Sequence, residues 1–253
     1  MRKYLIIMFG LLLLVPSLVF SDAASFKVTY FIPRAQSDLW EIEFENMDFS
    51  KSSFQNTSMG FSYEYFLTRE ISFLIGIDTY SQRKVGLYKD YDGITFDEGD
   101  FAFLKDYGFE GDFSISHVFD VSITPIQLSM KLAPTGRRFR IIPYLGAGVG
   151  IYLWNVRLQG DSIDFDDIWE YEDEDGWVYE IYQIYLTDAR EENKINFGFH
   201  AFVGFSYPIA RRMSIDTEFK FIMAKGNLTE GFEGFEPFDL SGYQISLGLS
   251  YWF

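Results

Sequence analysis

Apolar and polar residues alternate with a period of two along most of this chain. The last segment is the clearest, because one parity is wholly apolar and the other is mostly small or polar. The two sets are Tyr243, Ile245, Leu247, Leu249, Tyr251 and Phe253 against Gly242, Gln244, Ser246, Gly248, Ser250 and Trp252. Successive side chains of a strand point to opposite faces, so this pattern predicts a strand with one apolar face. Bulky residues on that face and small ones opposite are expected where lipid lies outside and a narrow lumen inside.

The same alternation recurs upstream and predicts eight strands in all. They are 26–33, 54–67, 71–84, 113–132, 139–156, 194–209, 212–226 and 240–253. In the fourth strand the apolar parity changes at Pro125, where we predict a β-bulge that resets the register. Short links alternate with long ones, which are 34–53, 85–112, 157–193 and 227–239. This layout predicts an all-β fold: an eight-stranded antiparallel up-and-down transmembrane β-barrel with short periplasmic turns and long outer loops.

The N-terminus has the order of a secretory signal: a basic start, an apolar run and small residues. Pro16 and the borderline length of the apolar run argue against an anchor helix. We therefore expect a signal peptide over residues 1–24, cleaved after Ala23 or Ala24, and a barrel domain over 25–253. The expected location is the bacterial outer membrane, reached through the periplasm.

Composition and charge exclude several kinds of site and partner. Aromatic residues make up 20% of the chain, which favours strands. Cysteine is absent, so disulfides, thiolate nucleophiles and cysteine-ligated metals are excluded. The formal net charge of −16 makes nucleic acid an unsuitable partner. Such a charge attracts divalent cations or basic partners instead.

Charged residues also occupy the parity that faces the predicted lumen. They are Lys27, Glu64, Asp78, His200, Asp216, Glu218 and Lys220. Charges inside a narrow barrel must pair, because an isolated ion out of water is costly. We interpret them as a structural network of salt bridges that fills the lumen. A gated proton or ion path through the same network is the alternative, with His200 as its pH-sensitive element.

The loop 157–193 combines many acids with interleaved aromatic residues. A loose cation site is one interpretation, formed by Asp164, Asp166, Asp167, Asp173 and Asp175. The run 173–176 is only a fragment of a calcium-binding loop. A solvated hairpin that continues the strands above the membrane is another interpretation, and an adhesion surface is a third. No cofactor is expected beyond loosely bound Ca²⁺ or Mg²⁺.

Two further features of the sequence bear on catalysis and cofactor binding. The run from Gly146 to Gly150 superficially resembles a dinucleotide loop, but it lies within a strand and its glycines are better explained as lumen-facing. His117 lies near the outer end of the fourth strand with Ser114 and Ser116 close by. The sequence offers no acid to orient this histidine, so we expect no enzyme.

The signal peptide, the eight segments and the ending Leu247–Phe253 resemble the small outer-membrane barrels related to the OmpA membrane domain and OmpX. Within that ending, Leu249, Tyr251 and Phe253 resemble the signal that the barrel-assembly machinery reads. The resemblance implies that this machinery, outer-membrane lipid and lipopolysaccharide are partners. It is architectural, so it says little about activity.

The sequence therefore predicts an integral outer-membrane barrel with a structural or surface-interaction role, in envelope integrity or adhesion through its acidic and aromatic loops. The extracellular partner is unknown. A narrow pore for small solutes or ions is the first alternative function. A lipid A-modifying enzyme is the second.

Overall fold

The computed structural model describes residues 22–253 apart from 109 and 137–138. Eight strands form a closed antiparallel barrel, which confirms the predicted fold class. They are β1 (Ala23–Pro33), β2 (Asn56–Phe66), β3 (Ile71–Leu87), β6 (Ser116–Leu132), β7 (Ile142–Glu172), β8 (Val178–Ala210), β9 (Met213–Gly226) and β11 (Gly242–Trp252). Almost all of the predicted signal peptide, residues 1–24, lies outside the described residues, and it stays a prediction.

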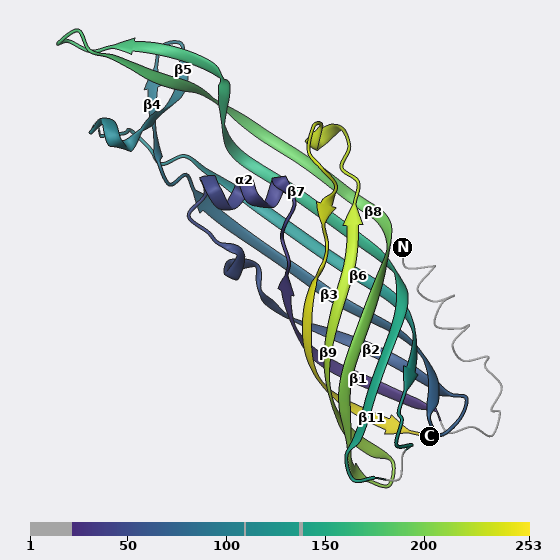
Figure 1. Ribbon diagram of the computed structural model, residues 1–253. Helices are drawn as coiled ribbons and strands as arrows, with labels where there is room; N and C mark the ends of the chain where they lie inside the picture. Colours follow the sequence, from purple (N-terminus) through teal and green to yellow (C-terminus); the bar gives the residue numbers. More distant parts are fainter. Residues whose placement is uncertain (1–21, 109, 137–138) are drawn as a thin grey trace, which may run out of the picture.

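The barrel is closed by β1, which pairs with both β2 and β11. A row of paired residues that starts at Trp252, at one end of β11, passes once around the barrel and returns to Gly242 at the other end. The strands are therefore strongly tilted, as a closed barrel requires. The two ends of the described chain meet at one rim, where the Phe253 N–H donates to the Asp22 carbonyl at 2.8 Å (Figure 1).

A belt of exposed apolar side chains surrounds the half of the barrel nearest the short turns, which we call its lower half. It includes Phe26, Phe61, Ile75, Leu128, Val149, Phe199, Phe219 and Leu247. Tyrosines lie on the outer surface near the short turns, and Arg140 and Arg212 donate hydrogen bonds to Tyr207 and Tyr251. An apolar belt bounded by amphipathic aromatic rings is the surface that a bilayer requires.

Among the residues that the structure describes, no helix has the length and apolar character needed to cross a bilayer.

The predicted bulge at Pro125 is wrong. β6 pairs with β7 from His117↔Gly160 to Leu132↔Leu145 without a shift, so one parity faces inward along the whole strand. What changes is the environment. Below Pro125 the outward residues are apolar because they face lipid. Above it the inward residues, such as Phe119, are apolar because they face a core, while outward Asp120 is polar.

A register shift does occur, but on β8. The pairing between β7 and β8 slips between Trp154 and Val156, opposite Asn193. Asn193 has φ of +55°, a left-handed conformation that asparagine tolerates better than most residues. Its N–H donates to Asn155 Oδ1 at 2.6 Å.

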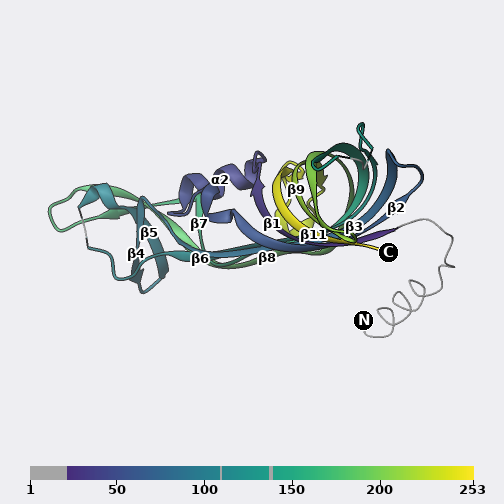
Figure 2. The same ribbon diagram turned by 90° about the horizontal axis from the view of Figure 1, so that it is seen from below.

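The predicted long loops contain regular structure beyond the barrel. β7 and β8 continue through most of 157–193 as one long hairpin, and β5 (Gly99–Leu104) and β4 (Tyr91–Phe96) extend its sheet. The segment 34–53 contains the helix α2 (Asp38–Asn46), which packs against the inner face of β6 near the outer end of that strand (Figures 1 and 2). Short elements complete the region: η1 (Lys51–Phe54), η2 (Lys105–Tyr107), η3 (Glu230–Phe232) and β10 (Phe238–Asp239).

Candidate functional site

The lower lumen is filled by charged side chains. All seven residues that the alternation placed inside are buried, with exposed fractions of 9% or less: Lys27, Glu64, Asp78, His200, Asp216, Glu218 and Lys220. They come from β1, β2, β3, β8 and β9 and face a common interior. Their burial follows from strand parity, because every second side chain of a small barrel must point inward.

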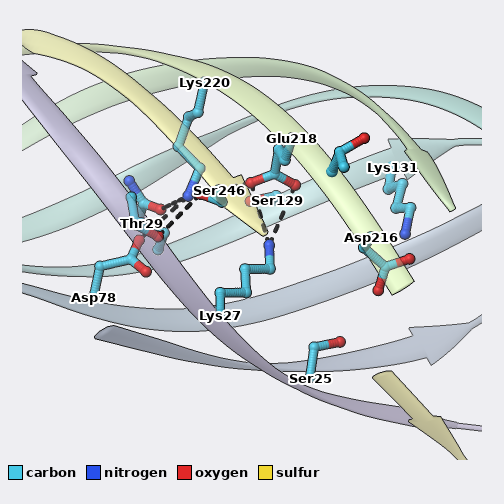
Figure 3. Close-up of polar contacts among 12 residues, drawn as sticks. Ser25, Lys27, Thr29, Asp78, Ser129, Lys131, Asp216, Glu218, Lys220 and Ser246 are labelled. Carbon is cyan, nitrogen blue, oxygen red and sulfur yellow. Dashed lines mark hydrogen bonds and ion pairs between the residues drawn. The ribbon is translucent and has the colours of Figure 1, made fainter. Parts of the chain in front are cut away.

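Glu218 is the centre of the charge network. Lys27 Nζ donates to both of its carboxylate oxygens at 3.2 Å, and Lys220 Nζ lies 3.7 Å from its Oε1 (Figure 3). Lys220 also donates to Asp78 Oδ2 at 3.3 Å. Each of these charges therefore has a partner of opposite sign, which offsets the cost of removing it from water.

The remaining predicted lumen residues bind nearer neighbours. Asp216 accepts hydrogen bonds from Ser250 and Ser214. His200 Nε2 lies 2.7 Å from Ser129 Oγ. The sequence-predicted residues thus share one compartment, but they are not all directly bonded to each other.

Sequence reasoning missed the lumen residues of β6. Lys131 donates to Glu64 Oε2 at 2.9 Å, and Gln127 accepts from Lys220 at 2.8 Å. The sequence contained a signal for both, because Gln127 and Lys131 alternate with the apolar residues Ile126, Leu128, Met130 and Leu132. A bulge at Pro125 would have interrupted this parity, which is in fact continuous along β6.

Glycines provide the space for these side chains. A Cβ added to Gly148 would lie 2.1 Å from the Leu128 carbonyl oxygen and 2.9 Å from the His200 ring. A Cβ on Gly146 would lie 2.3 Å from the Phe202 ring. The glycine run is therefore lumen packing in a strand and does not form a phosphate-binding loop.

Above the charged layer, the interior becomes an aromatic core. Trp40 of α2 lies with its ring centroid 5.0 Å from that of Phe54 and 5.1 Å from those of Phe119 and Phe238. Trp154 stacks on Phe238 at 5.8 Å. These side chains are buried and come from the barrel wall and from the segments folded over its mouth.

The cavities within the lumen are small. The cavity between Lys27, Asp78 and Glu218 has a volume of about 20 Å³, which is room for about one water molecule. Two further interior cavities, beside Asp216 and beside Tyr152, have volumes of about 10 Å³ each. The charged layer and the aromatic core together fill most of the lumen between these cavities.

A buried histidine–glutamate pair joins α2 to the barrel strand β6. His117 Nε2 lies 2.7 Å from Glu43 Oε2 of α2, and its Nδ1 lies 3.3 Å from the Asp161 carbonyl oxygen. Both side chains are at most 5% exposed. The ring of Tyr88 meets His117 edge-on, and burial raises the pKa of Tyr88 to about 12. The acid that the sequence did not offer for His117 is thus Glu43, which lies far away in the chain. The pair holds α2 in place.

A second carboxylate fastens the loop after β9. Glu191 of β8 accepts hydrogen bonds from Thr229 N at 2.5 Å and Thr229 Oγ1 at 2.7 Å, and it pairs with Lys194 at 2.7 Å. Burial raises the pKa of Glu191, but the hydrogen bonds from Lys194 and Thr229 outweigh burial and leave the pKa below its ordinary value.

We predict that acid releases this loop. Because the folded-state pKa of Glu191 is lowered, its contribution is present above the unfolded pKa of about 4.3 and is lost as pH falls through the folded value. The Thr229 amide resonance, followed by NMR in micelles, should move in an acid transition. Glu191→Gln should abolish that transition, whereas Glu192→Gln on the adjacent exposed residue should leave it unchanged. A transition that survives in Glu191→Gln would contradict this assignment.

Beyond the membrane, the sheet order is β7, β8, β5 and β4 (Figure 1). Aromatic residues lie on both faces of this sheet. On one face Phe101 and Phe103 are buried with Ile181. On the other, Tyr91, Phe165 and Tyr182 form a cluster with ring centroids 5.5 to 5.8 Å apart. The exposed large side chains of this region include Trp177, Leu186, Val178, Ile168, Tyr185 and Trp169.

The predicted cation site is not assembled. The five aspartates are Asp164, Asp166, Asp167, Asp173 and Asp175. Among the described residues, no group of three or more histidine or acidic side chains is close enough to hold an ion. Asp173 instead caps the hairpin turn, because its Oδ1 accepts from the N–H groups of Asp175 and Trp177 at 2.9 Å. Asp164 likewise binds the local backbone, because its Oδ1 accepts from the Asp166 N–H at 3.1 Å.

Comparisons with known proteins agree on the architecture. No known protein-family profile matches the chain, and no curated protein matches it. Among solved structures, the outer membrane protein OprG from Pseudomonas aeruginosa is 12% identical, with a TM-score of 0.51 over 92% of this chain and 96% of that one. Neisserial surface protein A is 14% identical, with a TM-score of 0.49 over 92% and 97% of the two chains. At such identity, the likeness to OprG shows the fold alone.

Proposed function

We propose that this protein, which has the fold of the small eight-stranded outer-membrane barrels, lies in a bacterial outer membrane and anchors an extracellular interaction surface. The apolar belt and its tyrosines support the location, since both suit a bilayer. Outer-membrane lipid and lipopolysaccharide would contact this belt. Leu249, Tyr251 and Phe253 all point outward, as a segment read by the barrel-assembly machinery would.

One observation carries the role: the barrel is sealed while its strands continue far beyond the membrane. The lumen holds paired charges and an aromatic core, which leave little room for a solute. The β7–β8 hairpin with β5 and β4 instead presents exposed aromatic and acidic side chains outside. An exposed aromatic surface of this kind suits binding to another molecule.

The alternatives have less support. A narrow pore would need a continuous path, and the charged layer and the core both interrupt it. A lipid A-modifying enzyme would need a free base near the outer rim. His117 faces Glu43 and the Asp161 carbonyl with its two ring nitrogens, so it is not available as that base.

The first test is conductance. Purified protein reconstituted in planar bilayers should give no stable current steps, because ions cannot pass the sealed lumen. Stable single-channel currents would overturn the structural role and favour the pore. Mass spectrometry of lipid A, with and without the protein, should show no change in its acyl chains.

The second test removes the outer part of the β7–β8 hairpin, to which β5 and β4 are joined. Because Ile163 and Ile184 are already paired, residues 164–183 can be replaced by an Asn-Gly turn that closes the hairpin there. Fluorescent vesicles that carry the intact protein should adhere to cell surfaces, and those with the short hairpin should not. Equal adhesion by the two would overturn the proposed function. Unchanged heat-modifiability on gels would show that the barrel itself remains folded.

A further inference from the structure

The extracellular sheet has one covered edge and one open edge. At the β4 edge, the Gly93 N–H donates to the Phe113 carbonyl at 2.8 Å, and the Thr95 N–H donates to Asp112 at 3.0 Å. At the other edge, β6 pairs with β7 only as far as Gly160. Beyond that point β8 is the one strand paired with β7 in the part of the chain that the structure describes. An open edge presents backbone groups that can pair with another chain.

The register shows which backbone groups face the open edge. The Asp173 N–H donates to the Trp177 carbonyl at 2.9 Å, so these two residues form a hydrogen-bonded pair. Hydrogen-bonded and non-hydrogen-bonded pairs alternate along an antiparallel ladder. The pairs Glu172↔Val178, Glu170↔Glu180 and Ile168↔Tyr182 are then of the second kind. The N–H and C=O groups of Ile168, Glu170 and Glu172 therefore point away from β8, towards the open edge.

The two faces beside this edge differ in chemistry. Trp169 and Tyr171 lie on one face, where their rings contact Phe101 and Phe96 at 5.3 Å. Glu170 and Glu172 lie on the other face, and Glu170 is directly opposite Glu180. A strand added at this edge would place successive side chains alternately beside aromatic rings and beside carboxylates.

We propose that the open edge of β7 between Ile168 and Glu172 binds an extended polypeptide segment in which apolar and cationic residues alternate. The backbone would add a strand to the sheet, its apolar side chains would contact Trp169 and Tyr171, and its cations would pair with Glu170 and Glu172. A second copy of this chain is a poor occupant, because its own edge would bring further carboxylates to the same acids. This inference rests on the proposed function and specifies its partner.

The test uses the full-length protein in micelles and synthetic peptides of defined pattern. The probe is a fluorescent peptide of alternating lysine and valine. One control alternates glutamate and valine, and another contains the lysines and valines of the probe in two blocks. Fluorescence anisotropy should show that the alternating lysine–valine peptide binds about tenfold or more tightly than either control. Equal binding of the block and alternating peptides would overturn the proposal, because charge alone would then explain the contact.

Variants separate strand addition from charge. Glu170→Pro removes an edge N–H without removing a hydrogen bond to β8, since edge strands tolerate proline where the N–H faces outward. Glu170→Ala keeps the N–H and removes the charge, and Glu180→Ala removes a neighbouring charge from β8. Glu170→Pro should weaken binding about tenfold beyond Glu170→Ala, and the two alanine variants should weaken it by similar, smaller factors. Equal affinities for Glu170→Pro and Glu170→Ala would overturn the proposal.

Hydrogen exchange tests strand addition in the wild-type protein, without a substitution that could misfold the end of the hairpin. In the wild-type protein, the amides of Ile168, Glu170 and Glu172 should gain protection from hydrogen exchange when the lysine–valine peptide binds, whereas those of β4 should not. No gain at these three amides would overturn strand addition. Peptide-independent dimers on sedimentation, lost in Glu170→Pro, would identify a second copy as the occupant and also overturn it. If the short-hairpin protein loses adhesion while the probe fails to bind, only the partner class is wrong.

Discussion

Glu218→Gln is expected to lower the free energy of unfolding of the barrel by about 3–5 kcal/mol, the usual cost of breaking a buried ion pair from one side. Lys27 donates to both oxygens of Glu218, and the neutral amide would leave this lysine without a counter-charge. Lys220 would retain Asp78, at 3.3 Å, so the loss falls mainly on Lys27. Urea unfolding in lipid vesicles, followed by tryptophan fluorescence, measures the change.

Two further variants sharpen this experiment. Thr217→Val changes the adjacent lipid-facing residue of the same strand and should have little effect. Combining Lys27→Met with Glu218→Leu removes both charges, and it should recover much of the lost stability because apolar side chains can replace a buried pair. An unchanged unfolding midpoint for Glu218→Gln would mean that water enters the lumen freely and that the barrel is not sealed.

Trp40→Ala is expected to cost about 3–5 kcal/mol, a typical loss for a large aromatic side chain removed from a core. Trp40 is 1% exposed, packs against three buried phenylalanines, and donates a hydrogen bond from Nε1 to the Asp239 carbonyl at 3.1 Å. The substitution would leave a cavity where α2 meets the barrel wall. The effect should be local, because the membrane belt makes no contribution to this core.

Limited proteolysis and hydrogen exchange measure the local effect. In Trp40→Ala, the segment 34–53 should be cleaved much faster and should lose amide protection, while heat-modifiability of the barrel on gels is preserved. Ile42→Ala is the matched control, because Ile42 lies on the same helix and is 41% exposed. It should change stability by about 0.5 kcal/mol or less. Full protection of 34–53 in Trp40→Ala would show that α2 is not held by this aromatic core.

Much of the candidate site was predictable because parity alone places a strand residue inside or outside. Lys27, Glu218 and Lys220 were assigned to the lumen on this basis, and the structure places them there. Lys131 was missed although the same rule applies to it. The pattern of β6 looked broken at Pro125, since apolar side chains face lipid below this point and a protein core above it. Alternation reports that two faces differ, but it does not say which of them is outside.

The long loops show the limit of local patterns. Acids interleaved with aromatic residues allowed a cation site, a hairpin or an adhesion surface. The fold shows the hairpin, whereas adhesion stays a proposal. β5 joins β8 through pairs such as Phe103↔Ile181, which connect segments far apart in the chain. His117 meets Glu43 across a similar separation, at 2.7 Å. No spacing in the sequence encodes contacts of this kind.

The sequence by itself determined that this is a barrel, where most of its strands lie, and which side chains of a strand share a face, because backbone geometry imposes a period of two on every strand. Only the tertiary structure decided which lumen charges pair, how α2 closes the mouth, and which extracellular edge is left open. Those features depend on the tilt and register of strands around a closed ring and on the packing of distant loops. Such relations arise only when the whole chain is folded.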